Sequence, residues 1–116
     1  MFFALVVQPD ALECTYGDIP NAVAESGDAC EVFKLEDGDW DLLDSEFVDA
    51  AYRVCHALLD YGDVDYLDAE QCALLQDWLD SRLENFLEPR LRILYAKLAD
   101  YTRRAQILGT GVVIEL

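Results

Sequence analysis

The sequence predicts an α+β domain in which a small two- or three-stranded sheet, formed by the N- and C-terminal segments, packs against three main helices. Two observations favour this fold class. Apolar runs typical of strands lie near both ends of the chain, and three long segments between them carry apolar residues at helical spacing. A length of 116 residues is typical of one folding unit, so we expect a single globular domain over residues 1–116.

Three segments are expected to form strands. The unbroken apolar run FFALVV, residues 2–7, is typical of a strand buried on both faces. GVVIEL at residues 111–116 is rich in β-branched side chains, and CEVFKLE at residues 30–36 is a weaker candidate. Between the first and third of these segments, a short helix is expected to begin at Pro20 and to end at Gly27.

The first long helix is expected to begin near Ser45 and to end at Gly62, because apolar residues recur every three or four positions between them. The loop DVDYL, residues 63–67, should follow it. Asp68 then caps the second helix, since Gln71 stands three positions later in the spacing of a capping box.

The second helix should stop or kink at Glu88, because a residue before proline avoids the α region. The third helix then begins with Pro89 in its first turn, runs to about Leu108 and is terminated by Gly109. The expected core residues of these two helices are Leu74, Leu75, Trp78, Leu79, Leu83, Phe86 and Leu87, followed by Leu91, Leu94, Tyr95, Leu98, Thr102, Ala105 and Leu108.

The chain is strongly acidic, and its charge is unevenly distributed. It contains 24 Asp and Glu against eight Lys and Arg, which gives a net charge of -16 at pH 7. Lys34 and Arg53 are the only basic residues before Ser81. Such a charge attracts basic protein surfaces and repels phosphate groups. We therefore expect a basic protein as partner and no direct binding to nucleic acid or to an anionic membrane.

The cysteines indicate a reducing compartment and no metal site. Cys14, Cys30, Cys55 and Cys72 are scattered without any C-x-x-C spacing. The N-terminal apolar run is too short for a signal peptide and lacks a basic segment before it. We expect a cytoplasmic protein with reduced thiols that act as small buried apolar groups, and no cofactor.

Two patterns resemble functional motifs but lack essential parts. Asp37, Asp39 and Asp41 alternate as the first ligands of a calcium loop do, yet Leu42 and Val48 stand where that loop needs Gly and Glu. A specific calcium site is therefore not expected.

The only histidine, His56, follows Cys55 directly, and on a helix their side chains point about 100° apart, so they do not form a catalytic dyad. His56 is instead expected on the polar face of its helix, four residues before Asp60. Without a phosphate-binding glycine motif either, the sequence indicates a protein that is not an enzyme.

Basic residues recur every seven positions on the third helix, at Arg90, Lys97 and Arg104. We expect them to be solvated or to pair with acidic residues of the neighbouring helix, rather than to bind phosphate. The predicted acidic partners are Asp77, Asp80 and Glu84.

The acidic residues gather in two clusters near helix ends, and aromatic residues are interleaved with them. Exposed aromatic side chains among charges are typical of binding hot spots. Alternatively, Trp40 and the two tyrosines only cover the core. The candidate partner-binding residues are Asp37, Asp39, Trp40, Asp41, Asp44, Glu46, Asp49, Asp60, Tyr61, Asp63, Asp65, Tyr66, Asp68 and Glu70.

These features predict a non-enzymatic binding protein that inhibits a basic, nucleic-acid-handling protein by occupying its polyanion-binding surface. In charge and size the chain is similar to anti-CRISPR and anti-restriction DNA mimics and to immunity proteins that neutralise nuclease toxins, although no motif supports the likeness. The alternative is a structural or self-associating cytosolic module, such as a homodimer, whose acidity serves only solubility.

Overall fold

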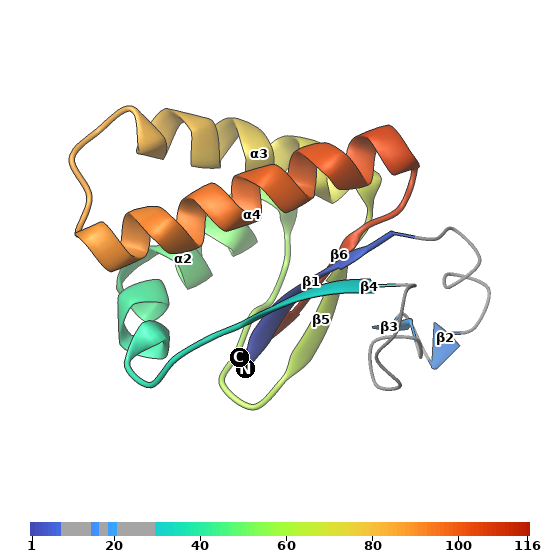
Figure 1. Ribbon diagram of the computed structural model, residues 1–116, viewed down its shortest axis with the longest axis horizontal. Coiled ribbons are helices and arrows are strands. Elements are labelled where there is room, and N and C mark those ends of the chain that lie inside the picture. The colour runs from blue at the N-terminus through green and yellow to red at the C-terminus, as the bar shows by residue number, and fades with distance from the viewer. Residues whose placement is uncertain (8–14, 17–18, 21–29) are drawn as a thin grey trace.

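The computed structural model describes residues 1–7, 15–16, 19–20 and 30–116. In these residues the chain forms three α-helices, a four-stranded antiparallel sheet and a small two-stranded sheet, so the predicted α+β class is confirmed (Figure 1). The helices lie together on one face of the larger sheet, and the N- and C-terminal ends lie side by side (Figure 1).

The larger sheet is built from strands far apart in the sequence. Its order is β4 (Cys30–Lys34), β1 (Phe2–Val6), β6 (Val112–Glu115) and β5 (Val64–Leu67). Every pair is antiparallel, and the register places Phe3 between Phe33 and Ile114. The smaller sheet pairs β2 (Thr15–Tyr16) with β3 (Ile19–Pro20).

The three expected strands are present, and β5 is an additional strand in the segment expected to be a loop. Val64, Asp65 and Tyr66 alternate as residues of a strand do, but the segment is short and aspartate is disfavoured in strands, so the signal is weak. The strand forms because β6 would otherwise leave its outer backbone groups unpaired inside the protein. Pro20 belongs to β3, and the rest of the short helix expected up to Gly27 lies outside the described residues.

The helices are α2 (Asp39–Cys55), α3 (Ala69–Leu83) and α4 (Pro89–Leu108). The capping box of Asp68 and Gln71 is present at the start of α3. Pro89 begins α4, and Gly109 ends it in the left-handed conformation, with φ 70°. These three predicted boundaries are confirmed.

The predicted limits of α2 are wrong at both ends. The helix begins at Asp39 rather than near Ser45, after Gly38 with φ 92°. It ends at Cys55 rather than at Gly62, because His56 adopts the left-handed conformation, with φ 60°. Its backbone N–H donates to the carbonyl of Tyr52 at 2.9 Å and so closes the helix.

The α3 helix ends at Leu83, five residues before the expected boundary at Glu88. Phe86 therefore lies in the loop that follows it and is 92% exposed. Leu74 is 46% exposed on α3, so neither side chain belongs to the core as expected. Leu108, at the end of α4, is also exposed.

The main core lies between the sheet and the three helices. Its members include Phe3, Leu5, Leu43, Phe47, Leu75, Leu79, Leu94, Tyr95, Leu98 and Ile114, all fully buried. Burial of each large side chain stabilises the fold by about 1.5–3 kcal/mol. A second cluster, on the opposite side of the sheet, contains Ala4, Val6, Cys30 and Val113. The strand FFALV is thus buried on both faces, as its composition predicts.

The thiols of Cys30, Cys55 and Cys72 are buried and unpaired. Desolvation raises the pKa of the Cys72 thiol to about 12 and also raises the pKa of Cys30 and Cys55. These thiols are therefore protonated and unreactive at neutral pH. Cys14 lies outside the described residues.

Gly111 allows β5 to approach β6 closely, and this contact is testable. A Cβ atom at Gly111 would overlap the carbonyl oxygen of Leu67 and the ring of Tyr66. We expect Gly111→Ala to lower the free energy of unfolding by about 2–3 kcal/mol, because β5 has to move away. Urea denaturation followed by circular dichroism measures this change.

Gly109→Ala is the matched control. A Cβ atom there would meet nothing within 4 Å, so only the left-handed backbone conformation is strained, at a cost of about 1 kcal/mol. Equal losses of stability in the two variants would show that the contact between β5 and Gly111 is not tight.

Candidate partner-binding surface

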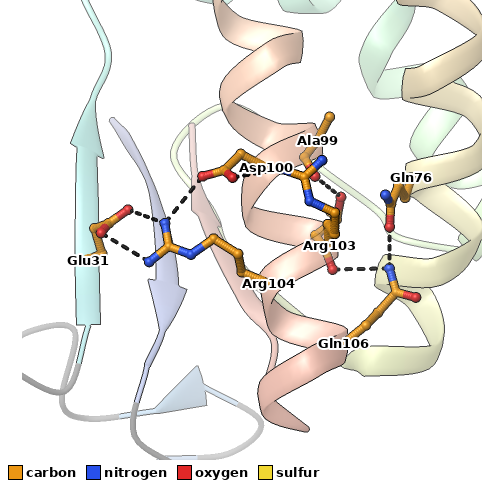
Figure 2. Close-up of polar contacts among 8 residues, drawn as sticks. Glu31, Gln76, Ala99, Asp100, Arg103, Arg104 and Gln106 are labelled. Carbon is orange, nitrogen blue, oxygen red and sulfur yellow. Dashed lines mark hydrogen bonds and ion pairs between the residues drawn. The ribbon is translucent and has the colours of Figure 1, made fainter.

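The basic stripe of α4, formed by Arg90, Lys97 and Arg104, lies against β4 rather than against α3. Arg104 donates to Glu31 of β4 at 2.9 Å and to Asp100 of its own helix at 3.2 Å (Figure 2). The ammonium group of Lys97 lies 5.6 Å from the ring centre of Phe33. The guanidinium carbon of Arg90 lies 5.8 Å from the same ring. Both positions allow cation–π attraction.

The acidic partners predicted for this stripe are therefore wrong. The stripe pairs with Glu31, Glu36, Asp39 and Asp100, and not with Asp77 and Asp80 of α3 or with Glu84 at the C-terminal end of that helix. The face of α4 that carries the stripe covers the sheet edge at β4, while α3 packs on another side of α4. Spacing along one helix could not reveal which neighbour that face meets.

Asp39 is part of this internal network and not of the exposed surface predicted from the sequence. Only 2% of the residue is exposed. Its carboxylate accepts hydrogen bonds from Nε and Nη2 of Arg90 at 3.0 and 2.8 Å, and from the backbone N–H of Glu36 at 2.7 Å. The hydrogen bonds from Arg90 lower the pKa of Asp39. The ion pair between Asp39 and Arg90 connects the start of α2 to the first turn of α4.

Glu46 is also held by neighbouring helices. Its Oε1 accepts hydrogen bonds from Arg82 of α3 at 3.0 Å and from the hydroxyl of Tyr95 of α4 at 2.9 Å. Asp49 differs, because it forms only an exposed ion pair with Arg53, four residues further along α2, at 2.8 Å. Such exposed pairs contribute about 0.3–0.5 kcal/mol, so Asp49 stays available to a partner.

The contact between Trp40 and Tyr61 brings the two acidic segments together. The ring centres are 5.4 Å apart and meet edge to face. Trp40 packs partly against the core, whereas Tyr61 is 66% exposed. The turn that carries Tyr61 is fixed, since the backbone N–H of Gly62 donates to the carbonyl of Leu116 at 2.6 Å. Trp40 thus covers the core, and Tyr61 offers an aromatic face to solvent.

Five exposed aspartates flank Trp40 and Tyr61 along the chain, and we call them the acidic end: Asp37, Asp41, Asp44, Asp60 and Asp63. Asp41 and Asp44 share one side of the first turns of α2, since they are three residues apart, and Asp37 lies just before the helix. All eight Lys and Arg lie within the described residues, and none of them forms an ion pair with a member of the acidic end.

The other predicted site residues lie beside the acidic end or have structural roles. Asp65 is half-buried on β5, and its pKa is raised by desolvation and then by the charges of Asp63 and Asp60. Asp68 caps α3, and Glu70 is exposed in the first turn of that helix. Tyr66 packs against the second cluster behind the sheet, and desolvation raises its pKa to about 12.

The prediction that His56 and Asp60 lie on one helix is wrong, because α2 ends at Cys55. The thiol of Cys55 donates to the carbonyl of Ala51 at 3.2 Å inside the core. His56 is exposed and meets Tyr52 edge to face.

Among the described residues, no group of three or more His, Cys, Asp or Glu side chains is placed to hold a metal ion. Of residues 37–48, which were compared with a calcium loop, residues 39–48 form the beginning of α2 instead. No helix in the described part of the chain has the length and apolarity needed to cross a bilayer.

The opposite pKa shifts of Asp39 and Asp65 are testable. Because the pKa of Asp39 is lowered in the folded protein, its charge stabilises the fold above its ordinary pKa of 3.8. This contribution is lost as the pH falls from that value through the folded-state pKa. We expect Asp39→Asn to lower the free energy of unfolding by about 3 kcal/mol at neutral pH, and by progressively less below about pH 4. Urea denaturation across this pH range measures the difference.

Asp65→Asn should act with the opposite sign. The pKa of Asp65 is raised, so its charge weakens the fold above the folded-state pKa, and the cost disappears as the pH falls below the ordinary value of 3.8. We therefore expect this variant to be more stable than the parent at neutral pH and equally stable at low pH. Destabilisation by both substitutions at neutral pH would contradict the opposite directions of the pKa shifts of Asp39 and Asp65.

The described surface therefore combines exposed aspartates with an aromatic pair, while Arg82, Arg90 and Arg104 are paired with carboxylates outside the acidic end. No protein-family model, curated protein or solved structure matches the chain.

Proposed function

We propose that the protein is a non-enzymatic inhibitor that binds a basic, nucleic-acid-handling protein and occupies its polyanion-binding surface. The observation that carries this proposal is the contact between Trp40 and Tyr61, which joins two acidic segments into one exposed surface. Neither segment alone would cover a binding groove, whereas together they offer five aspartates and an aromatic ring to one partner.

The spacing of the carboxylates suits a surface that binds phosphates. Along α2, Asp41 and Asp44 are separated by about 4.5 Å of helix axis. Phosphates of one DNA strand are about 3.4 Å apart along the duplex axis. Lysine and arginine side chains that reach successive phosphates can therefore reach these carboxylates. Association would be fast and salt-sensitive, because charges are screened beyond about 8 Å at physiological ionic strength.

The charges near the turn of residues 60–63 support a cationic partner. The pKa of Asp65 is raised first by desolvation and then, to a smaller extent, by the charges of Asp63 and Asp60. A basic surface placed over the acidic end would offset the repulsion among these carboxylates.

The proposal includes a cytoplasmic location and excludes nucleic acid and membranes as direct ligands. The buried, unpaired thiols of Cys30, Cys55 and Cys72 are consistent with a reducing compartment. The net charge of -16 opposes binding to phosphate groups of nucleic acid or lipid.

Charge removal at the acidic end tests the proposal. The variant Asp37→Asn/Asp41→Asn/Asp60→Asn removes three exposed charges without touching the Asp39 network. We expect the immobilised parent protein to capture a basic nucleic-acid-binding protein from cell extract, and the variant to bind that protein at least about tenfold more weakly. Duplex DNA and added salt should both release the captured protein.

The matched control, Asp77→Asn/Asp80→Asn/Glu84→Gln, removes three exposed charges from α3 and its C-terminal end. We expect it to bind like the parent protein, because these residues are not in the acidic end. Capture that survives the first triple substitution, or that duplex DNA does not displace, would contradict the proposed function.

Self-association is a second candidate function, favoured by exposed apolar side chains on the α3–α4 hairpin. Phe86 is 92% exposed in the connecting loop, and Leu74 and Ile93 are about half exposed on the two helices. This function predicts a dimer that persists in high salt and dissociates in the variant Phe86→Ser. Light scattering over a range of concentrations measures it, and a mass that stays monomeric throughout rules it out.

A further inference from the structure

A groove runs beside the acidic end, between α2 and the segment that follows it. It has a volume of about 300 Å³ and is lined by Asp44, Val48, Asp49, Tyr52, Leu58 and Leu59. This volume is at the lower limit of ordinary ligand pockets, which hold roughly 300–1,000 Å³. The lining is mainly apolar, and both aspartates belong to the α2 side.

The groove exists because the chain reverses at the end of α2. The left-handed conformation of His56 ends the helix, and the backbone N–H of Ala57 donates to the carbonyl of Ala51 at 3.2 Å. The following residues return beside α2, since Tyr61 reaches Trp40 near the beginning of that helix. The helix and the returning segment form the two walls.

The returning segment alternates as an extended chain does, and this places an apolar side chain in solvent. Ala57 and Leu59 are buried in the core, whereas Leu58 between them is 71% exposed. Across the groove, Tyr52 is 51% exposed. Two large apolar side chains thus face solvent across a groove in an otherwise charged surface, which is the composition of a hot spot.

We propose that this groove receives one apolar side chain of a basic polypeptide segment, whose flanking lysine or arginine residues contact Asp44, Asp49 and the acidic end. This inference rests on the proposed function and specifies the partner: a cationic segment with an apolar anchor, rather than a uniformly charged surface. The occupant is cationic because carboxylates border the groove and continue into the acidic end. A second copy of this chain is disfavoured, since it would bring its own charge of -16.

Two synthetic peptides with six arginine or lysine residues each test the inference. They differ only at the central position, which is Leu in one peptide and Ser in the other. We expect the parent protein to bind the Leu peptide about tenfold more tightly than the Ser peptide in fluorescence anisotropy titrations. Both affinities should fall as the salt concentration rises.

Leu58→Ser should remove the preference for the Leu peptide and leave the affinity for the Ser peptide, with its salt dependence, unchanged. Tyr52→Ala should reduce the same preference from the opposite wall. Leu74→Ser, an exposed leucine of α3, is the matched control and should keep the preference. Circular dichroism confirms that each variant is folded.

The possible failures are distinct. If the parent protein binds both peptides equally and salt-sensitively, or if Leu58→Ser and Tyr52→Ala both keep the preference, the groove is not the anchor site, while the acidic end remains a cation-binding surface. If the parent protein binds neither peptide at low salt, the proposed function fails, and this inference fails with it.

Discussion

The antiparallel pairing of β1 with β6 is the constraint on which the rest of the structure depends. These strands form the centre of the sheet and are buried on both faces, and the three helices cover one of these faces. The chain passes from α4 into β6 through Gly109, Thr110 and Gly111. The hydroxyl of Thr110 donates to the carbonyl of Val6 at 2.6 Å and locks this junction to β1. The position of α4 over the sheet is thereby fixed.

The position of α4 in turn decides which carboxylates are neutralised. Its basic face meets β4 and the start of α2, where Arg104 binds Glu31 and Arg90 binds Asp39. The aspartates of the acidic end lie just before α2, in its first turns and in the turn of residues 60–63, and no arginine of the described chain pairs with them. The charge of the exposed surface is thus a result of topology as well as of composition.

Local signals predicted much of the fold. The capping box at Asp68, the proline that begins α4 and the glycine that ends it each act within a few residues, and the apolar runs at the two ends determined the central strands. The end of α2 could not be predicted, because the preference of histidine for the left-handed conformation is weak and such residues are uncommon. Likewise, β5 contains aspartate and depends on a partner strand far along the chain.

The candidate surface was predicted in part. The sequence identified the acidic and aromatic residues but not their division into internal and exposed groups. The partner of Asp39 is 51 positions away, and nothing near Asp39 indicates its burial. The contact between Trp40 and Tyr61 likewise depends on the reversal of the chain at His56, a tertiary feature that periodicity cannot reveal.

The burial of Asp39 has a consequence for the thermodynamics of the proposed recognition. The carboxylate of Asp39 holds the first turn of α2 in place, so the exposed neighbours of Asp39 project from backbone that is already ordered. In the proposed association, ordering these neighbours would cost little conformational entropy, because only side-chain rotamers would remain to be restricted. A flexible acidic tail of equal charge would have to order its backbone as well.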